Sequence, residues 1–228
     1  MSIDLVNIDT LDFDRVIALS DIHGDLQALD ALLSNINLTQ NDLLITLGDY
    51  VDRGHFSAQV LDRLIEMHKG GNVISLRGNH DQWMIDARDD EDNAEFWLTL
   101  GGSSTLASYE EESIDAVPDT HWDFLTKTCV DIAEAERHIF VHGYVEYGVA
   151  LKEQIHEAIQ MLQHQHGAGH DSGKIIVCGH SSTQSGLPED KGHTIAIETK
   201  IWLNAVDLNN QIIWRADSNG LCDEIPLI

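Results

Sequence analysis

Three short apolar segments, each followed by polar residues and then by a helical pattern, occupy the first ninety residues of the chain. They are RVIAL from residue 15, DLLITL from residue 42 and NVISL from residue 72. Apolar residues recur at helical spacing after each segment, most clearly within 26–33 and 57–69. Because strands that alternate with helices join by right-handed crossovers, this order predicts a parallel β-sheet with the connecting helices packed against it.

The remainder of the chain predicts further strands. Apolar runs or period-two alternation indicate strands over 130–135, 138–143, 174–180, 193–199, 201–208 and 211–217. We expect the first two to form a hairpin, and Asn209-Asn210 suits a tight turn between the last two.

Two other segments have helical character. Residues 91–127 are expected to be helical with a break at LGGSS, and Ile155, Ile159 and Leu162 are spaced as on one face of a helix over 152–166. We find no repeat, linker or low-complexity segment. The sequence therefore predicts one domain over 1–228, with 85–127 as a variable helical lid.

Charge and cysteine content exclude several classes of partner. Thirteen Lys and Arg face 39 Asp and Glu, a formal net charge of −26, and such a surface repels nucleic acid and anionic membranes. No run of about 18 apolar residues and no export signal is found, so we expect neither membrane insertion nor secretion. Three widely spaced cysteines without a CxxC pair predict free thiols and a cytoplasmic location.

The polar residues after five predicted strands share one chemistry. They are DIHGD at 21–25, GDYVDRG at 48–54, GNHD at 78–81, VHG at 141–143 and GH at 179–180. Ligands of open α/β sheets bind at the carboxyl ends of the strands, where these motifs converge. Carboxylate, amide and imidazole donors without a thiolate suit Mn, Fe or Zn. Because six such ligands exceed the need of one tetrahedral ion, two divalent metal ions that share a carboxylate are predicted.

In order and in spacing, these five motifs resemble those of the calcineurin-like metallophosphoesterases of the phosphoprotein phosphatase type, and most closely the bacterial Ser/Thr protein phosphatases. The resemblance covers roughly residues 13–216. It implies an α/β fold of the αββα sandwich type, with two central mixed β-sheets flanked by helices. It also implies a binuclear-metal-dependent phosphatase, most often with Mn, that acts on a phosphoprotein at serine or threonine, with tyrosine as an alternative, or on a small phosphoester.

The resemblance also implies a role for each matching residue. Asp21 and His23 would bind the first metal, Asp49 would bridge both metals, and the second metal would be completed by Asn79, His142 and His180. The nucleophile would be the water that bridges the metals.

Three further residues would act on the substrate itself. His80 would protonate the leaving oxygen as general acid, and Asp52 would orient the His80 ring. Arg53 would hold a phosphate oxygen with its guanidinium group.

The sequence departs from the family pattern on the substrate side. Residues 143–173 contain neither Trp nor Arg, although the family usually has there an arginine that makes a second phosphate contact. The family's later Asp-Thr-Gly is replaced by Glu198-Thr199-Lys200, and Tyr144 follows VHG where Ala-Gly is common.

These departures leave two alternatives to a phosphomonoesterase. One is a symmetrical dinucleoside tetraphosphate hydrolase, a relative that typically has Gln at the position of His23 and VARG in place of VDRG. The other is a metal-binding regulator with weak activity, which the altered segments 143–173 and 198–200 motivate.

Overall fold

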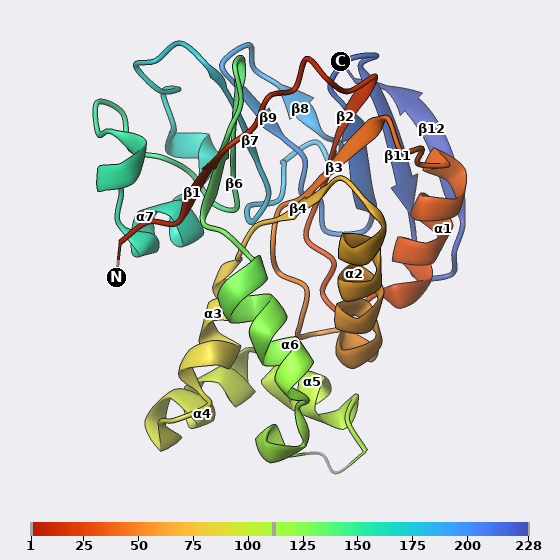
Figure 1. The fold of residues 1–228 in the computed structure, drawn as a ribbon, viewed down its shortest axis with the longest axis vertical. Helices are drawn as coiled ribbons and strands as arrows, with labels where there is room; N and C mark the ends of the chain where they lie inside the picture. Colours follow the sequence, from red (N-terminus) through yellow and green to blue (C-terminus); the bar gives the residue numbers. More distant parts are fainter. Residues whose placement is uncertain (1, 111–112, 228) are drawn as a thin grey trace.

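Two β-sheets pack face to face in the computed structural model, which describes residues 2–110 and 113–227. Figure 1 shows the sheets side by side in the upper part of the molecule, with α1 (Leu26–Ile36) outside one sheet and α7 (His156–Met161) outside the other. Apolar side chains from both sheets form one buried cluster between them, including Val16, Ile45, Phe140 and Val177. This arrangement confirms the expected αββα sandwich.

The sheet nearer α1 is mixed and has the strand order β12-β11-β10-β2-β3-β4. The predicted N-terminal strands β2 (Arg15–Leu19), β3 (Asp42–Thr46) and β4 (Val73–Ser75) are parallel. The tail adds β10 (Leu203–Asp207), β11 (Ile212–Ala216) and β12 (Cys222–Pro226), which are antiparallel. The turn at Asn209-Asn210 joins β10 to β11, as expected, and both residues' backbone N–H groups donate to Asp207.

The second sheet has the order β1-β5-β6-β7-β9-β8 and is also mixed. The predicted hairpin consists of β5 (Ile132–Glu134) and β6 (His138–Val141), and β7 (Ile175–Cys178) and β9 (Thr194–Ala196) continue the sheet in parallel. The edge strands β1 (Leu5–Asn7) and β8 (Glu189–Asp190) were not expected from the sequence, and neither was β12.

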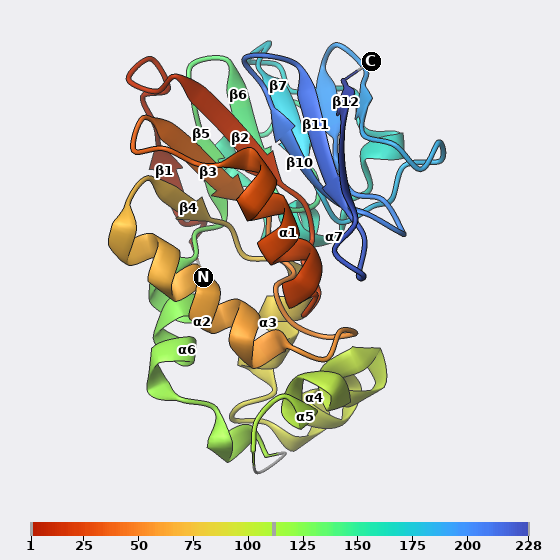
Figure 2. The ribbon, with the colours of Figure 1, turned by 90° about the vertical axis from the view of Figure 1, so that its right-hand side faces the viewer.

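Helices α1 and α2 (Ser57–Gly70) cover the outer face of the first sheet (Figure 2). The Asp25 carboxylate accepts a hydrogen bond from the backbone N–H of Ala28 and so caps the first turn of α1. Most of the apolar positions that predicted both helices are buried, among them Leu29, Leu32 and Leu64, and Leu26 and Ile65 are half-buried. Both helices begin directly after a candidate motif, so their packing also fixes where the motifs lie.

A group of short helices extends away from the sheets in Figures 1 and 2. It contains α3 (Asn79–Asp86), α4 (Glu91–Trp97), α5 (Ser103–Ala107) and α6 (Asp119–Asp123), with π-helical turns at Leu98–Gly102 and Phe124–Thr128 and a 3₁₀ turn at Ile114–Ala116. The expected break at LGGSS is present, because Gly101 has a non-helical φ of 120°. Residues 111 and 112 of the expected lid lie outside the described residues.

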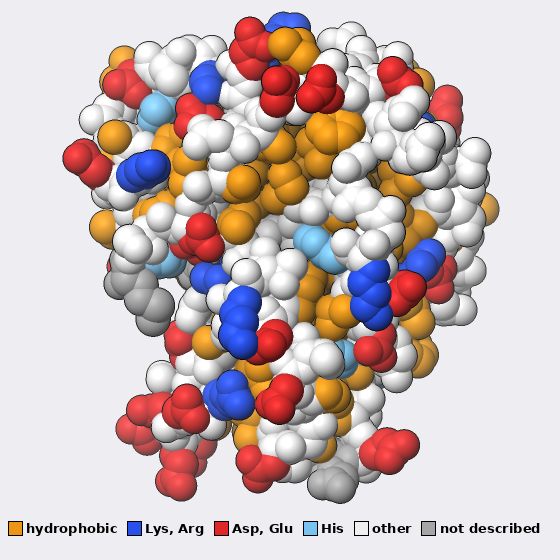
Figure 3. Space-filling view, viewed as in Figure 1, with side chains coloured by type: hydrophobic (Ala, Val, Ile, Leu, Met, Phe, Trp, Pro, Cys, Tyr) orange, Lys and Arg blue, Asp and Glu red, His pale blue; other side chains and the backbone are white. Residues whose placement is uncertain are grey.

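Much of the negative charge lies on this helical part. The carboxylates at the lower left of Figure 3 gather over α4, where the exposed acidic residues include Asp89, Asp90, Glu91 and Asp92. They are solvated and lie on a different part of the surface from the strand ends. Within the described residues no helix is both long and apolar enough to cross a membrane.

The predicted continuous helix over 152–166 is wrong. Only α7 is α-helical, and it is flanked by 3₁₀ turns at Leu151–Glu153 and His164–His166. Ile155 and Leu162, which were expected on the buried face, are 57% and 39% exposed. The Gln154 side chain explains the late start, because it bonds to the backbone of Glu146 and Val149 while Gln154 itself has a non-helical ψ of 155°.

Candidate metal and catalytic site

The polar residues that follow the predicted strands meet at one end of the two sheets. The loops after β2 and β3, the first turn of α3 after β4, and the residues after β6 and β7 all contribute. The side chains brought together there are Asp21, His23, Asp49, Asn79, His80, His142 and His180. The convergence expected from the strand ends is therefore observed.

Two groups of side chains have the composition and spacing of metal sites. The ligand atoms of His23, Asp49 and His80 lie within 4.8 Å of one another, as do those of Asp49, His142 and His180. Asp49 belongs to both groups. A carboxylate in this position is what two neighbouring cations would share.

Asp49 lies between two imidazole rings. Its Oδ2 is 3.6 Å from His23 Nε2 and 3.4 Å from His142 Nε2, and its Oδ1 accepts a hydrogen bond of 2.9 Å from the backbone N–H of His80. Burial alone would raise the pKa of Asp49, but the positive charge of His142 and its hydrogen bond hold that pKa well below the usual range. Asp49 is therefore an ionised carboxylate at neutral pH.

Backbone carbonyls fix the orientation of both rings. His23 Nδ1 donates to the carbonyl of Val51 at 2.9 Å, and His142 Nδ1 donates to the carbonyl of Leu47 at 2.8 Å. Burial lowers the pKa of His23 to about 4, so its ring is neutral at pH 7 and Nε2 carries a lone pair. This buried Nε2 has no hydrogen-bond partner among the described residues. Metal-binding histidines have this arrangement, because the second N–H holds the ring in place.

The second group also fits a cation. His142 Nε2 lies 2.9 Å from Asn79 Oδ1 as well as close to Asp49. When the His142 ring is neutral and Nδ1 carries its proton, His142 Nε2, Asn79 Oδ1 and Asp49 Oδ2 all present lone pairs to one another. A positive charge is therefore needed to hold them together. Burial alone would lower the pKa of His142, but Asp49 and Asp21 raise it to about 9, so a proton serves this purpose in the metal-free protein. The His180 ring, whose pKa burial lowers to about 4, packs edge-on against His142.

Asp21 lies outside both groups but beside the second. Its Oδ1 accepts a hydrogen bond of 3.1 Å from the backbone N–H of His180 and lies 4.0 Å from His142 Nδ1. Burial and the nearby charge of Asp49 outweigh the attraction of His142 and raise the pKa of Asp21 to about 6. A divalent cation would relieve the repulsion between these two buried carboxylates.

The three residues expected to act on the substrate are in contact with one another. His80 Nδ1 donates to Asp52 Oδ2 at 2.7 Å, and Arg53 Nη2 donates to His80 Nε2 at 3.0 Å. Both ring nitrogens of His80 are thus engaged by Asp52 and Arg53. For this reason its closeness to His23 and Asp49 does not by itself make His80 a metal ligand.

Backbone strain is concentrated at this end of the sheets. Seven described non-glycine residues have a positive φ, and five of them are candidate site residues: His23, Asp49, Asp52, Arg53 and His180. Each such conformation costs on the order of 1–3 kcal/mol unless the surrounding structure holds it, and such residues cluster at functional sites.

Close backbone approach explains two of the motif glycines. A Cβ atom on Gly78 would collide with Asp49 Oδ1, and one on Gly179 would collide with Asp21 Oδ1. Asp81 holds the same region together. Its carboxylate accepts hydrogen bonds from the backbone N–H groups of Gly78, Asp49 and Tyr50.

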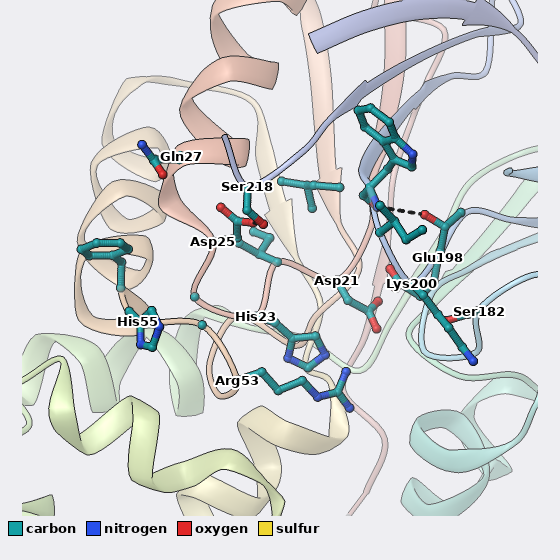
Figure 4. A pocket seen from close by; sticks show the side chains of 18 of the residues that line it. Asp21, His23, Asp25, Gln27, Arg53, His55, Ser182, Glu198, Lys200 and Ser218 are labelled. Atoms are coloured by element: carbon teal, nitrogen blue, oxygen red, sulfur yellow. Dashed lines mark hydrogen bonds between the residues drawn. The ribbon is translucent and has the colours of Figure 1, made fainter. Parts of the chain in front are cut away.

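A cavity of about 780 Å³ opens beside Asp21, His23, Arg53 and His180 (Figure 4). Glu198 and Lys200 line the wall opposite His23. None of the residues that line the cavity belongs to the described part of 85–127. The expected lid instead contacts Asp52, because Trp97 and Thr105 donate hydrogen bonds to its carboxylate.

Sequence reasoning did not assign a functional role to three residues near the site: Trp97, Thr105 and Glu198. Glu198 is buried, and its Oε2 has no hydrogen-bond partner among the described residues. Burial and the charges of Asp21 and Asp49 raise the pKa of Glu198 well above its ordinary value. The one sequence feature that could have indicated a role for Glu198 is the replacement of the family's Asp-Thr-Gly by Glu-Thr-Lys at 198–200.

Comparisons with known proteins agree with the geometry. The sequence model of the family described as calcineurin-like phosphoesterase matches residues 14–209. Serine/threonine-protein phosphatase 2 of Escherichia coli (strain K12) is 32% identical over 113 residues, which are 48% of this chain and 50% of that protein. Serine/threonine-protein phosphatase 1 of Salmonella typhimurium is 34% identical over 96 residues, 42% of each chain. The matched region thus spans about half the length of these curated relatives.

Solved structures share the fold at low sequence identity. The crystal structure of a putative diadenosine tetraphosphatase has a TM-score of 0.67 and 19% identity, and the match covers 99% of both chains. A protein serine/threonine phosphatase from Saccharomyces cerevisiae, with similarity to human phosphatase PP5, has a TM-score of 0.61 and 13% identity over 98% of this chain and 84% of that one. At these identities the matches establish the fold alone.

Proposed function

Since the chain belongs to the calcineurin-like phosphoesterase family, we propose that it is a phosphomonoesterase that requires two divalent metal ions and acts on serine or threonine phosphoproteins. The observation that carries the proposal is the position of Asp49. Its Oδ2 lies between His23 Nε2 and His142 Nε2, and Asp49 belongs to both groups of candidate ligands.

In this proposal the residues divide between the two metals as the family resemblance implies. Asp21 and His23 hold the first ion, Asp49 bridges, and the second ion is completed by Asn79, His142 and His180. Oxygen and imidazole donors without a thiolate favour Mn, with Fe and Zn as alternatives. When bound, such ions lower the pKa of a coordinated water toward about 7 and neutralise charge on the phosphoryl group.

The protein's own side chains supply the remaining chemistry. Arg53 is the guanidinium group nearest the candidate metals on the cavity wall, and a phosphate oxygen offers it a better partner than His80 Nε2 does. Once Arg53 turns to the phosphate, a proton can occupy His80 Nε2 while Nδ1 still donates to Asp52. His80 then transfers that proton to the leaving oxygen as general acid.

Lys200 supplies a second positive charge to the same cavity. Segment 143–173 has no arginine, and the Lys and Arg residues that line the cavity are Arg53 and Lys200. Lys200 is exposed and lines the cavity, so its ammonium group is available to an anionic substrate. We assign it to the second phosphate contact.

A substrate panel on metal-replete protein tests the function. We expect phosphate release from phosphoserine and phosphothreonine peptides after loading with Mn, and weaker release from a phosphotyrosine peptide. A dinucleoside tetraphosphate belongs in the panel because the chain shares its fold with the crystal structure of a putative diadenosine tetraphosphatase. Symmetrical cleavage of the dinucleotide in preference to the peptides would overturn the phosphoprotein assignment. Turnover no higher than that of an Asp49→Asn variant would indicate a metal-binding regulator instead.

Metal binding is expected to release protons at neutral pH. Because the pKa of His142 is raised to about 9, its ring is protonated at pH 7 and must lose that proton to bind a cation. His23 and His180, with pKa values lowered to about 4, release none. Loss of this proton alone should make manganese affinity rise about tenfold between pH 7 and 8, with a smaller rise as the pH approaches 9.

Calorimetric titration of the metal-free protein with Mn in buffers of different ionisation enthalpy measures the proton count. We expect His142 to contribute about one proton per protein at pH 7 and about half a proton at pH 9, in addition to any proton lost by coordinated water. A buffer-independent heat at pH 7 would contradict the assignment of His142 as a ligand.

A further inference from the structure

Two side chains of the helical segment bind the carboxylate of Asp52. The indole Nε1 of Trp97 lies 3.0 Å from both Oδ1 and Oδ2, and the hydroxyl of Thr105 donates to Oδ1 at 2.7 Å. His80 Nδ1 donates to Oδ2 on the other side at 2.7 Å. All four residues are buried, with Asp52 and Thr105 fully inaccessible to solvent. Three donors thus determine how the carboxylate is oriented.

Thr105 also holds the backbone of Asp52. The Asp52 N–H donates to Thr105 Oγ1 at 2.8 Å, so one hydroxyl contacts both the main chain and the side chain of the same residue. Asp52 has a φ of 71°, a conformation that a non-glycine residue keeps only when its surroundings enforce it. The double contact is such a constraint.

The glycine pair in LGGSS allows the segment to come this close. A Cβ atom on Gly102 would lie 2.5 Å from the ring of Trp97, and one on Gly101 would lie 3.1 Å from the backbone nitrogen of Arg53. Gly101 also has a φ of 120°, which a residue with a side chain rarely adopts. The break between α4 and α5 is therefore the point at which the helical segment closes onto Asp52 and Arg53.

We propose that Trp97 and Thr105 are positioning residues that hold the Asp52 carboxylate in the orientation in which it binds His80. The inference rests on the proposed function, because it concerns the general acid of that reaction. A carboxylate that has lost one donor can rotate about its Cβ–Cγ bond, and the imidazole then loses its fixed direction. The helical segment 85–127 acts on catalysis through this contact, although none of its described residues lines the cavity.

Substrates that differ in leaving group test the proposal. General-acid catalysis matters for a serine alkoxide and much less for p-nitrophenolate, which leaves without protonation. In Trp97→Phe, which removes only the indole N–H and part of the ring, kcat on a phosphoserine peptide should fall about 10- to 100-fold. The kcat on p-nitrophenyl phosphate should fall less than about fivefold, with both KM values nearly unchanged. An equal loss on both substrates, or a change confined to KM, would overturn the positioning role.

Matched variants separate positioning from general damage. Thr105→Val removes the hydroxyl at constant shape and should reproduce the leaving-group dependence, whereas Thr105→Ser keeps the hydroxyl and should restore the wild-type ratio. Trp122→Phe is the control for loss of a buried indole from the same segment, and it should leave the ratio unchanged. Metal content is measured in every variant and should be equal. Should Trp97→Phe fail to fold, the Thr105 pair decides the question.

A spectroscopic measurement distinguishes failure of this inference from failure of the proposed function. In the protein loaded with diamagnetic Zn, the Nδ1 proton of His80, identified by its loss in His80→Asn, should give a low-field NMR resonance because it is bonded to Asp52. That resonance should shift or broaden in Trp97→Phe and Thr105→Val and stay in place in Thr105→Ser and Trp122→Phe. This readout needs no turnover. An unchanged resonance in both Trp97→Phe and Thr105→Val would disprove the inference even in an active enzyme.

Discussion

An Asp49→Asn variant is expected to lose tight metal binding and to release phosphate at least about a thousandfold more slowly than the wild type. Asparagine has nearly the shape of aspartate, so the substitution removes one negative charge from between the rings of His23 and His142. Divalent cations contribute several kcal/mol to phosphoryl transfer, and each 1.4 kcal/mol corresponds to about a tenfold change in rate. Because Asp49 belongs to both ligand groups, one substitution should weaken both metals.

The measurement is metal content after dialysis against micromolar Mn, followed by turnover on p-nitrophenyl phosphate. Asp207→Asn is the matched control, since Asp207 is also a buried carboxylate but binds the turn between β10 and β11. It should retain wild-type metal content, provided that it remains folded by circular dichroism. If Asp49→Asn instead retained two metals per chain, the bridging assignment would be wrong.

Strands that lie inside the sheets could be predicted because their surroundings leave a clear pattern. β2 and β3 are covered on both faces, so they read as continuous apolar runs bounded by polar motifs. The three strands that were missed, β1, β8 and β12, all lie at sheet edges. An edge strand has one neighbour and more solvent, and Cys222–Pro226 alternates no more clearly than a loop does.

The error over 152–166 has a related cause. Three apolar residues at helical spacing indicate an amphipathic helix only if that face is buried, and Ile155 and Leu162 are exposed instead. A local interaction competes with the helix, because the Gln154 side chain forms hydrogen bonds to the backbone of Glu146 and Val149. The α-helix therefore begins only after Gln154, and α7 is six residues long. Spacing alone contains no information about such a side-chain contact.

The same distinction applies to the site. The candidate metal ligands could be proposed because each directly follows a strand, so local order along the chain already indicated a common edge. Trp97 and Thr105 reach Asp52 from 45 and 53 residues away, and nothing near Asp52 in the sequence indicates them. Their one local sign is the glycine pair at 101–102, which only the structure explains as a close approach.

Strain and function are coupled at Asp52 and Arg53, which are consecutive residues with positive φ. The fold keeps this pair in place through contacts from three directions: Thr105 on the Asp52 backbone, Gly101 beside the Arg53 nitrogen, and His80 on both side chains. A change in the helical segment can therefore alter the general acid without touching the metals. Loss of a metal ligand should therefore lower metal content and activity together, whereas loss of the general acid should lower activity alone.

The second large effect is expected for His80→Asn. Removal of a general acid typically lowers the rate about 10²- to 10⁴-fold, and we expect a loss of this size in kcat on a phosphoserine peptide. Metal content should not change, because the ring nitrogens of His80 bind Asp52 and Arg53 and not the candidate metals. This combination is the reverse of Asp49→Asn, in which metal and activity are lost together.

Both quantities are measured on the same sample, with turnover normalised to bound Mn. His138→Asn serves as the control, because His138 is a half-buried histidine on β6 outside the site. His80 also lies within 4.8 Å of the ligand atoms of His23 and Asp49, so a ligand role makes a competing prediction. If His80 were a ligand, the variant would lose about one metal per chain and its activity would recover at high Mn concentration. A general acid instead leaves the activity low at every Mn concentration, because added metal cannot replace the missing proton donor.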